Sequence, residues 1–225
     1  MGQAIYQPSF FSASAASPEF DFSSARHIAL DAGSWIEHIP NWLAEPEALF
    51  AKLMEVAPWL QRDRWMYTRT VIEPRLTADF PNVDDVPLPA LRAIATELSA
   101  HYGVRYRSLW VNLYRDQHDS TAWHGDNIGR VQAESIVPVL TLGATRRFLI
   151  RPTSGGRTLT FRPVSGDLIV MGGRAQRDWR HCVPKEATPS GPRISINFAP
   201  ERHSLLRSLA RTGWSTSARA GAAGS

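Results

Sequence analysis

The stretch YRSLWVNLYRDQHDSTAWHGD, residues 106–126, decides the fold class. The pattern of its first nine residues predicts a β-strand over 106–114. Side chains two residues apart point to the same side of a strand, so Trp110, Asn112 and Tyr114 share one face. Further short strands follow it, separated by Gly and Pro. They are predicted at 136–142, 147–151, 158–161, 167–171 and 193–198.

Upstream of these strands, apolar residues recur at helical spacing. This pattern predicts helices over 45–56 and 88–102, the second one ending at Gly103. Helices early in the chain and strands later favour an α+β fold, in which a jelly-roll barrel forms the core and the N-terminal helices pack on its sheet.

The composition fits one globular domain, since 43% of the 225 residues are hydrophobic and 20% are charged. We expect a flexible N-terminus (1–25), a single domain (26–202) and a flexible tail (203–225). The single cysteine cannot form an internal disulfide, and no segment has the roughly 18 apolar residues of a membrane span. We therefore expect a cytoplasmic monomer without a membrane partner. The sequence pI of about 9.6 permits a polyanionic partner.

A group of candidate metal ligands begins at His124. In an extended segment His124 and Asp126 point to the same side, because they are two residues apart. His181 follows the apolar strand 167–171 and can return beside them in a closed barrel. Two imidazoles and one carboxylate suit non-haem Fe(II) and leave coordination positions open, although Mn, Co, Ni or Zn would also bind. His181 alone could instead be a core histidine bonded to a backbone carbonyl.

The last predicted strand, RISINF at 193–198, places Arg193, Ser195 and Asn197 on one face. An arginine that faces the core needs an anion, because an unpaired buried charge is strongly unfavourable. One end of a dicarboxylate would meet this need, and Asn112 and Tyr114 are suitable donors for its oxygens. Alternatively, Asn112 satisfies a strand edge and Tyr114 is a core ring.

In their order along the chain, these motifs resemble the AlkB family of Fe(II)/2-oxoglutarate-dependent dioxygenases, in its branch that repairs alkylated nucleic acids. The resemblance covers residues 58–198. It rests on EPRLTA (73–78), NLYRD (112–116), WHGD (123–126), TLGATRRF (141–148), GDL (166–168), WRH (179–181), VPK (183–185) and PR (192–193).

The resemblance implies a double-stranded β-helix and two groups of site residues. The Fe(II) ligands would be His124, Asp126 and His181. The 2-oxoglutarate residues would be Asn112, Tyr114 and Arg193, with Ser195 and Asn197 on the same strand face as weaker matches. For the substrate we expect contacts from Arg75 and Asn127, and a base stacked on Phe80 or Trp65; alternatively, either ring fills the core. The implied enzyme uses O2 to dealkylate N-alkylated bases such as 1-methyladenine or 3-methylcytosine in DNA or RNA, and releases aldehyde, succinate and CO2.

Three departures from the family pattern leave other functions open. Ala199 occupies the position of a second arginine, Asn127 stands where acidic residues are common, and no aromatic stretch follows Phe80. One alternative is a dioxygenase for a protein or small-molecule substrate, and another is a metal-binding or nucleic-acid-binding module with little turnover. For a nucleic-acid partner, the arginines expected to contact phosphates are Arg69, Arg75, Arg146, Arg174 and Arg177.

Overall fold

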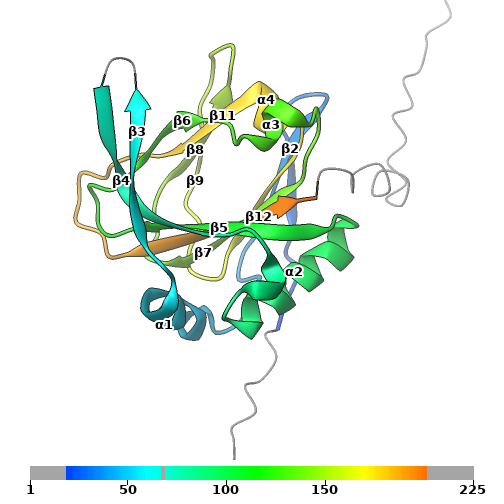
Figure 1. Cartoon of the computed structure of the whole chain (residues 1–225). Coiled ribbons are helices and arrows are strands. Elements are labelled where there is room, and N and C mark those ends of the chain that lie inside the picture. Colours follow the sequence, from blue (N-terminus) through cyan, green and yellow to red (C-terminus); the bar gives the residue numbers. More distant parts are fainter. Residues whose placement is uncertain (1–18, 67–68, 202–225) are drawn as a thin grey trace, which may run out of the picture.

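The computed structural model describes residues 19–66 and 69–201, and the side chains of 64–71 are not part of this description. Within these residues the strands form two antiparallel sheets that face each other (Figure 1). The larger sheet has the order β1 (Arg26–Ala29), β2 (Ser34–Ile39), β10 (Leu168–Gly173), β7 (Val137–Gly143), β12 (Arg193–Pro200), β5 (Tyr106–Tyr114), β4 (Arg69–Phe80) and β3 (Leu60–Met66). The smaller sheet has the order β6 (Thr121–His124), β11 (Trp179–Val183), β8 (Phe148–Pro152) and β9 (Leu159–Phe161).

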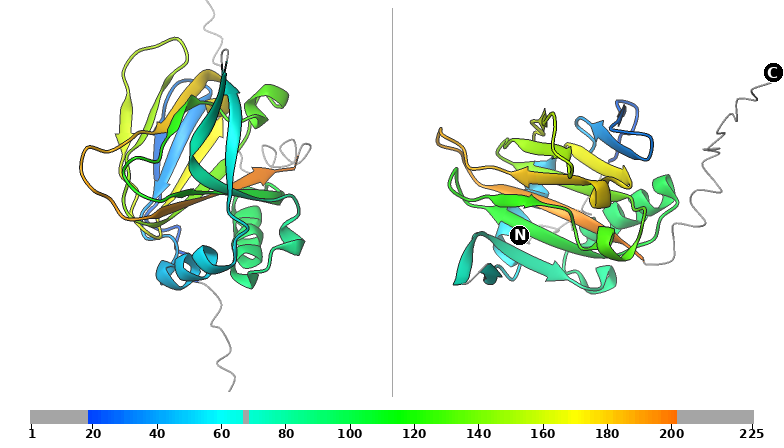
Figure 2. Two further views of the ribbon diagram at one scale, coloured as in Figure 1. Left: turned by 60° about the vertical axis from the view of Figure 1, so that its left-hand side comes forward. Right: turned by 90° about the horizontal axis from the view of Figure 1, so that it is seen from above.

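This arrangement is the predicted jelly-roll core, with strands that lie far apart in the sequence paired side by side. The central strand β12 pairs with β5 on one edge, from Arg193 opposite Tyr114, and with β7 on the other, from Arg193 opposite Gly143. Figure 2 shows the two sheets stacked face to face. Alternate side chains of β5 and β12, the polar face of each strand among them, point towards the smaller sheet.

Two helices cover the outer face of the larger sheet, as the sequence predicted (Figure 1). Helix α1 (Pro46–Val56) and helix α2 (Pro89–Tyr102) each begin with a proline, which is tolerated in the first helical turn. Helix α2 ends at Gly103, whose φ of 63° provides the left-handed turn that terminates the helix. Their buried leucines belong to the main hydrophobic cluster under the sheet. The remaining helical turns are η1 (Val83–Asp85), α3 (Ile128–Val131) and α4 (Ala175–Asp178).

The predicted flexible N-terminus is wrong for its last residues. Phe20 stacks on Trp42 at a ring distance of 4.9 Å, and the backbone N–H of Asp21 donates to the carbonyl of Trp42. Phe22 stacks on His101 at 3.6 Å. The two phenylalanines thus hold residues 20–22 on the core, where the serine- and alanine-rich composition gave no sign of packing. The predictions for 1–18 and for the tail from 203 lie outside the described residues.

Among the described residues, the helices are too short or too polar to cross a membrane. The two longest helices are α1 with 11 residues and α2 with 14.

Candidate active site

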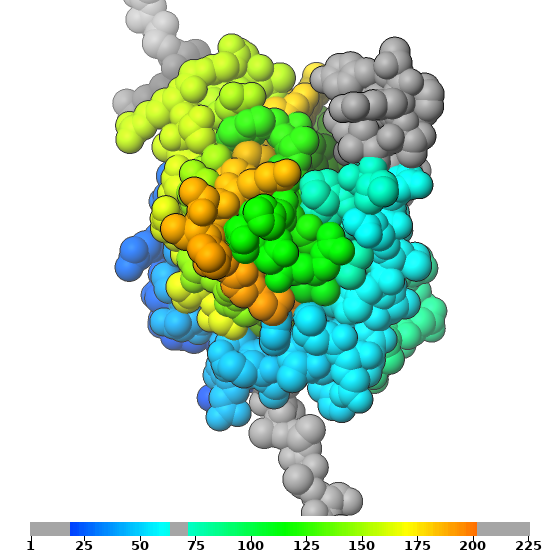
Figure 3. Space-filling model, turned by 90° about the vertical axis from the view of Figure 1, so that its left-hand side faces the viewer, coloured from blue at the N-terminus to red at the C-terminus, as the bar shows by residue number. Residues whose placement is uncertain are grey.

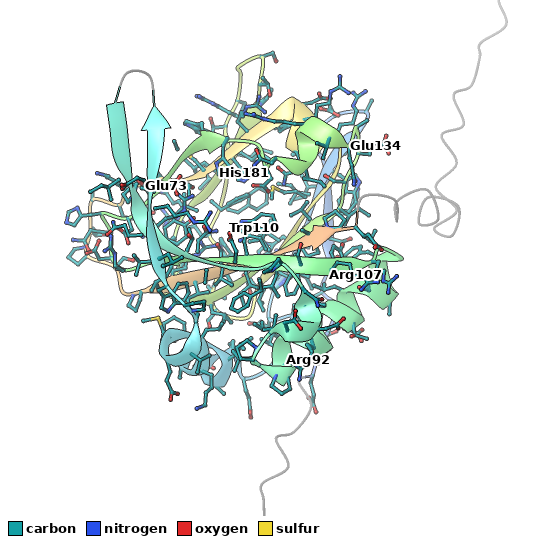
Figure 4. All side chains as sticks on the ribbon, viewed as in Figure 1. Glu73, Arg92, Arg107, Trp110, Glu134 and His181 are labelled. Carbon is teal, nitrogen blue, oxygen red and sulfur yellow. The ribbon has the colours of Figure 1, made fainter. Side chains whose placement is uncertain are left out.

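A cavity of about 1200 Å³ lies between the two sheets. In Figure 4, His181 from the smaller sheet and Trp110 from the larger sheet both project into this space. The walls combine the polar faces of β5 and β12 with residues of β6, β11, α3 and α4. The cavity therefore collects side chains from Arg62 to Glu201 along the chain, and the predicted metal ligands are among them.

The three predicted metal ligands meet at one point of the cavity wall. His181 on β11 is directly opposite His124 on β6, which brings the two rings to 4.3 Å. One oxygen of Asp126, Oδ1, lies 3.6 Å from Nε2 of His124 and 3.8 Å from Nε2 of His181. All three ligand atoms lie within 4.8 Å of one another. Such a group could hold one metal ion and leave part of its coordination sphere to the cavity.

The protonation of the three side chains also suits a metal. Nδ1 of His124 lies 2.8 Å from the carbonyl oxygen of Ala122, so this nitrogen carries the proton and Nε2 offers its lone pair. Burial lowers the pKa of His181 to about 4, which keeps this ring neutral at pH 7. Burial acts to raise the pKa of Asp126, but the polar contacts with His181, His124 and Gln176 outweigh it and hold the pKa below its usual value. The carboxylate is therefore ionised.

Gln176 on α4 holds the carboxylate ligand in position. Its side-chain oxygen accepts a 2.8 Å hydrogen bond from the backbone N–H of Asp126, and its side-chain nitrogen lies 3.5 Å from the sulfur of Met171. The backbone of Gln176 packs so closely on Gly125 that an added Cβ there would clash with the Gln176 carbonyl oxygen. The glycine between the two ligands is therefore needed for close packing of α4.

We expect Gly125→Ala to weaken metal binding by about tenfold or more, because the chain must move at the residue between His124 and Asp126. Moving a metal ligand out of its proper position weakens the binding free energy by at least about 1.4 kcal/mol, which is tenfold in affinity. Titration of the purified protein with Co(II), followed by its absorption, measures this affinity. The control is Gly191→Ala, where the nearest atom is 3.7 Å from an added Cβ. Equal affinities for the two variants would contradict this role of Gly125.

Arg193 forms a cationic anchor in the cavity wall. It is 2% exposed, and its Nη2 donates to the hydroxyl of Thr141 at 3.0 Å. Its Nε and Nη1 are buried and have no hydrogen-bond partner among the described residues. Its guanidinium lies 5.3 Å from the centre of the Tyr114 ring. Burial lowers the pKa of this guanidinium, and its two free nitrogens are suited to bind an anion.

The polar side chains next to the anchor are already bonded to each other. Asn112 donates to the hydroxyl of Ser195 at 3.2 Å, and its side-chain oxygen accepts from Nε of Arg75 at 3.1 Å. Arg75 also forms a 3.0 Å ion pair with Glu73. Asn197 donates to the carbonyl oxygen of Trp110 at 3.1 Å. The predicted face of β12 is confirmed, and Arg75 lies in the cavity wall instead of on an outer phosphate-binding surface.

Arg146 has a structural position, so the prediction that it contacts phosphates is wrong. It is 1% exposed and donates to the carbonyl oxygens of Asp116, Asp119 and Pro184. These bonds join two loops, residues 115–120 and 184–192, which lie side by side in Figure 3 in green and orange. The second loop leads directly into Arg193, the first residue of β12.

The predicted substrate residues lie in different parts of the structure. Phe80 is only 8% exposed and packs in the main core, so the prediction that it stacks on a base is wrong. On β4, Phe80 shares the core-facing side with Ala78, whereas Thr77 and Asp79 line the cavity. Asn127 is exposed at the start of α3 and lines the cavity. The side chain of Trp65 lies outside the described residues.

Sequence reasoning missed two residues that support the site and gave a third, in the cavity wall, no role. Gln176 gave no signal, because it lies 50 residues after the carboxylate that it supports. Thr141, the partner of Arg193, could have been found from the alternation of β7. Trp110 was placed on the correct face but was given no role.

Comparisons with known proteins agree with this geometry. The model of the 2OG-Fe(II) oxygenase superfamily matches residues 80–199. The chain is 32% identical over 176 residues to "Alpha-ketoglutarate-dependent dioxygenase alkB homolog 3" of Bos taurus, covering 69% of this chain and 62% of that relative's length. It is 27% identical over 223 residues to "DNA oxidative demethylase ALKBH2" of Arabidopsis thaliana, covering 78% of this chain and 69% of the relative.

A solved structure supports the same fold. The 2OG-Fe(II) oxygenase family oxidoreductase from Burkholderia pseudomallei aligns with a TM-score of 0.52 at 18% identity, over 75% of this chain and 86% of that one. The family match includes the His124–Asp126 segment and most of the strand that begins at Arg193. The chain therefore belongs to the 2OG-Fe(II) oxygenase superfamily, and the resemblance to its AlkB members that the sequence indicated is confirmed.

Proposed function

We propose that this protein is an Fe(II)/2-oxoglutarate-dependent dioxygenase that removes alkyl groups from N-alkylated bases in DNA or RNA. One observation carries the catalytic part of this proposal. A complete His-Asp-His group and a buried arginine without an anion line the same cavity. The first suits Fe(II) and the second suits one carboxylate of 2-oxoglutarate, which are the metal and co-substrate that the family uses.

Each part of the site then has a defined task. His124, Asp126 and His181 would hold the iron, which when bound supplies the oxidation of the alkyl carbon by O2. Nε and Nη1 of Arg193 would donate to the far carboxylate of 2-oxoglutarate. Asp126 Oδ2, also buried without a partner among the described residues, remains available to the metal or to a bound water.

The nucleic-acid part of the proposal rests on the relatives and on the cavity mouth. The relative from Arabidopsis thaliana is named as a DNA oxidative demethylase. Arg130, Arg177 and Arg180 line the cavity beside α3 and α4, and the Arg177 side chain is 60% exposed. Guanidinium groups at the cavity entrance can bind the phosphates that flank a base turned into the cavity.

Two measurements on the purified protein test the proposal. Formation of succinate from 2-oxoglutarate with Fe(II) and ascorbate tests for a dioxygenase. An oligonucleotide with 1-methyladenine or 3-methylcytosine tests the substrate, because replacement of one methyl group by hydrogen lowers its mass by about 14 Da. Succinate without mass loss would favour a protein or small-molecule substrate. No succinate with any substrate would leave a binding module.

We also expect demethylation to weaken strongly as salt is raised. Each phosphate contact adds about 0.7 to 0.9 to the slope of log affinity against log salt, so three contacts would lower affinity about 20- to 40-fold between 50 and 200 mM salt. The measurement is kcat/KM for a methylated oligonucleotide at increasing KCl. Uncoupled succinate formation without oligonucleotide is the control, and it should change little. A flat salt profile for both reactions would argue against a nucleic-acid substrate.

A further inference from the structure

The positive net charge of the chain comes from one segment, residues 202–225. The whole chain has 25 basic and 21 acidic side chains, which gives its net charge of +4. The segment 202–225 contains four arginines and no aspartate or glutamate. Residues 1–201 therefore have 21 side chains of each sign and a net charge of zero. The basic pI of the sequence is thus a property of this segment.

The folded part of the chain offers few arginines for a polyanion. Several arginines of the described residues form ion pairs at 2.8 to 3.0 Å: Arg75 with Glu73, Arg115 with Asp119, Arg147 with Glu186 and Arg174 with Asp178. Two others, Arg146 and Arg193, are buried. Because neighbouring charges of opposite sign cancel at a distance, this part of the protein gives little long-range attraction for a polyanion.

The segment 202–225 begins at the rim of the cavity. Strand β12 ends at Pro200, and both Pro200 and Glu201 line the cavity. The side chain of Glu201 is 43% exposed and lies 3.8 Å from Arg105 and 3.7 Å from Arg107, so the cavity wall meets solvent here. A stretch of 24 residues spans at most about 80 Å. The segment can therefore reach phosphates on either side of a base that enters the cavity.

We propose that residues 202–225 form a nucleic-acid-binding arm, an inference that rests on the proposed function. The four arginines would donate to backbone phosphates. Trp214 stands between the arginines at 211 and 219, and basic residues interleaved with an aromatic ring suit a single strand of any sequence. Because the arm starts at the cavity rim, a strand that it holds stays at high local concentration beside the metal ligands.

The experiment uses the whole chain with four charges removed in one of two places. The arm variant combines Arg202→Gln, Arg207→Gln, Arg211→Gln and Arg219→Gln. The control variant combines Arg26→Gln, Lys52→Gln, Arg157→Gln and Arg162→Gln, four exposed positions that do not line the cavity. Fluorescence anisotropy measures binding of an unmethylated single-stranded oligonucleotide at increasing KCl. Succinate formation without oligonucleotide and the urea midpoint check that each variant keeps its site and its fold.

We expect the arm variant to bind the oligonucleotide about tenfold or more weakly at 50 mM KCl. Its slope of log affinity against log salt should be smaller by about 3, because each phosphate contact to a single strand adds about 0.7. The control variant should keep a slope within about 1 of the unmodified protein. For an oligonucleotide with one 1-methyladenine, the arm variant should show a higher KM at an unchanged kcat.

Three other results would decide against the arm or against the proposed substrate. Equal slopes for the arm variant and the unmodified protein would overturn the inference alone, as would an equally large loss in the control variant. Binding of the unmodified protein, but not of the arm variant, to phosphatidylserine vesicles, together with unchanged oligonucleotide binding, would assign the segment to a membrane and overturn the inference. A smaller slope in the arm variant, with no demethylation by the unmodified protein, would support the arm and overturn the proposed substrate.

Discussion

Replacing Asp126 with alanine is expected to abolish metal binding and turnover while the protein stays folded. The carboxylate supplies one of three ligands, and its Oδ1 is the atom that lies between the two histidine nitrogens. Its other oxygen, Oδ2, has no partner within the described residues, so the fold loses little when the side chain is removed. His181→Ala should have the same effect on turnover. Bound Fe(II) per chain and succinate formation are the two measurements.

A carboxylate outside the site provides the control for this prediction. Asp84 in η1 is exposed and does not line the cavity, so Asp84→Ala should bind metal and form succinate normally. Circular dichroism and the urea midpoint of each variant check that it is folded. Full activity of Asp126→Ala or of His181→Ala would remove that residue from the iron site.

Replacing Arg193 with methionine is expected to have opposite effects on binding and on stability. Loss of charge-assisted hydrogen bonds, about 1.5 to 3 kcal/mol each, should weaken 2-oxoglutarate about tenfold to a hundredfold or more. In the absence of 2-oxoglutarate, however, the guanidinium is a buried charge with two unpaired nitrogens. Its replacement by an apolar side chain of similar length should raise the free energy of unfolding.

Thermal unfolding with and without 2-oxoglutarate measures both effects in one experiment. The unmodified protein should become more stable when 2-oxoglutarate is added, and the Arg193→Met protein should not respond. Arg92→Met is the control, because Arg92 on α2 lies on the outer side of the larger sheet, as Figure 4 shows, and donates to the carbonyl oxygen of Val86. A lower stability of Arg193→Met without co-substrate would mean that the arginine has a partner in the folded protein.

Local sequence patterns predicted the parts of the fold that depend on neighbouring residues. The strand at 106–114 was predicted with its observed bounds, and the alternation in 193–198 assigned Arg193 to the cavity face. The two main helices begin within one residue of their predicted starts. These features follow from strand and helix periodicity, which a single segment contains in full.

The remaining features depend on partners far away in the chain. Strands β1 and β2 are short and were not predicted, since they are stabilised by pairing with each other and, for β2, with β10. The buried position of Arg146 depends on two loops that meet only in the folded protein. Likewise, Phe80 has the same local pattern whether its ring faces the core or the cavity. For the metal ligands, only the His124–Asp126 pair is local, and His181 meets it through β6–β11 pairing.

A crystal structure of the protein grown without oxygen, with Fe(II) and 2-oxoglutarate, tests the central claim most directly. We expect one metal ion bound by Nε2 of His124, Nε2 of His181 and a carboxylate oxygen of Asp126. We also expect the far carboxylate of 2-oxoglutarate on Nε and Nη1 of Arg193. A metal ion bound away from these three side chains, or an Arg193 that stays unpaired beside bound co-substrate, would contradict it.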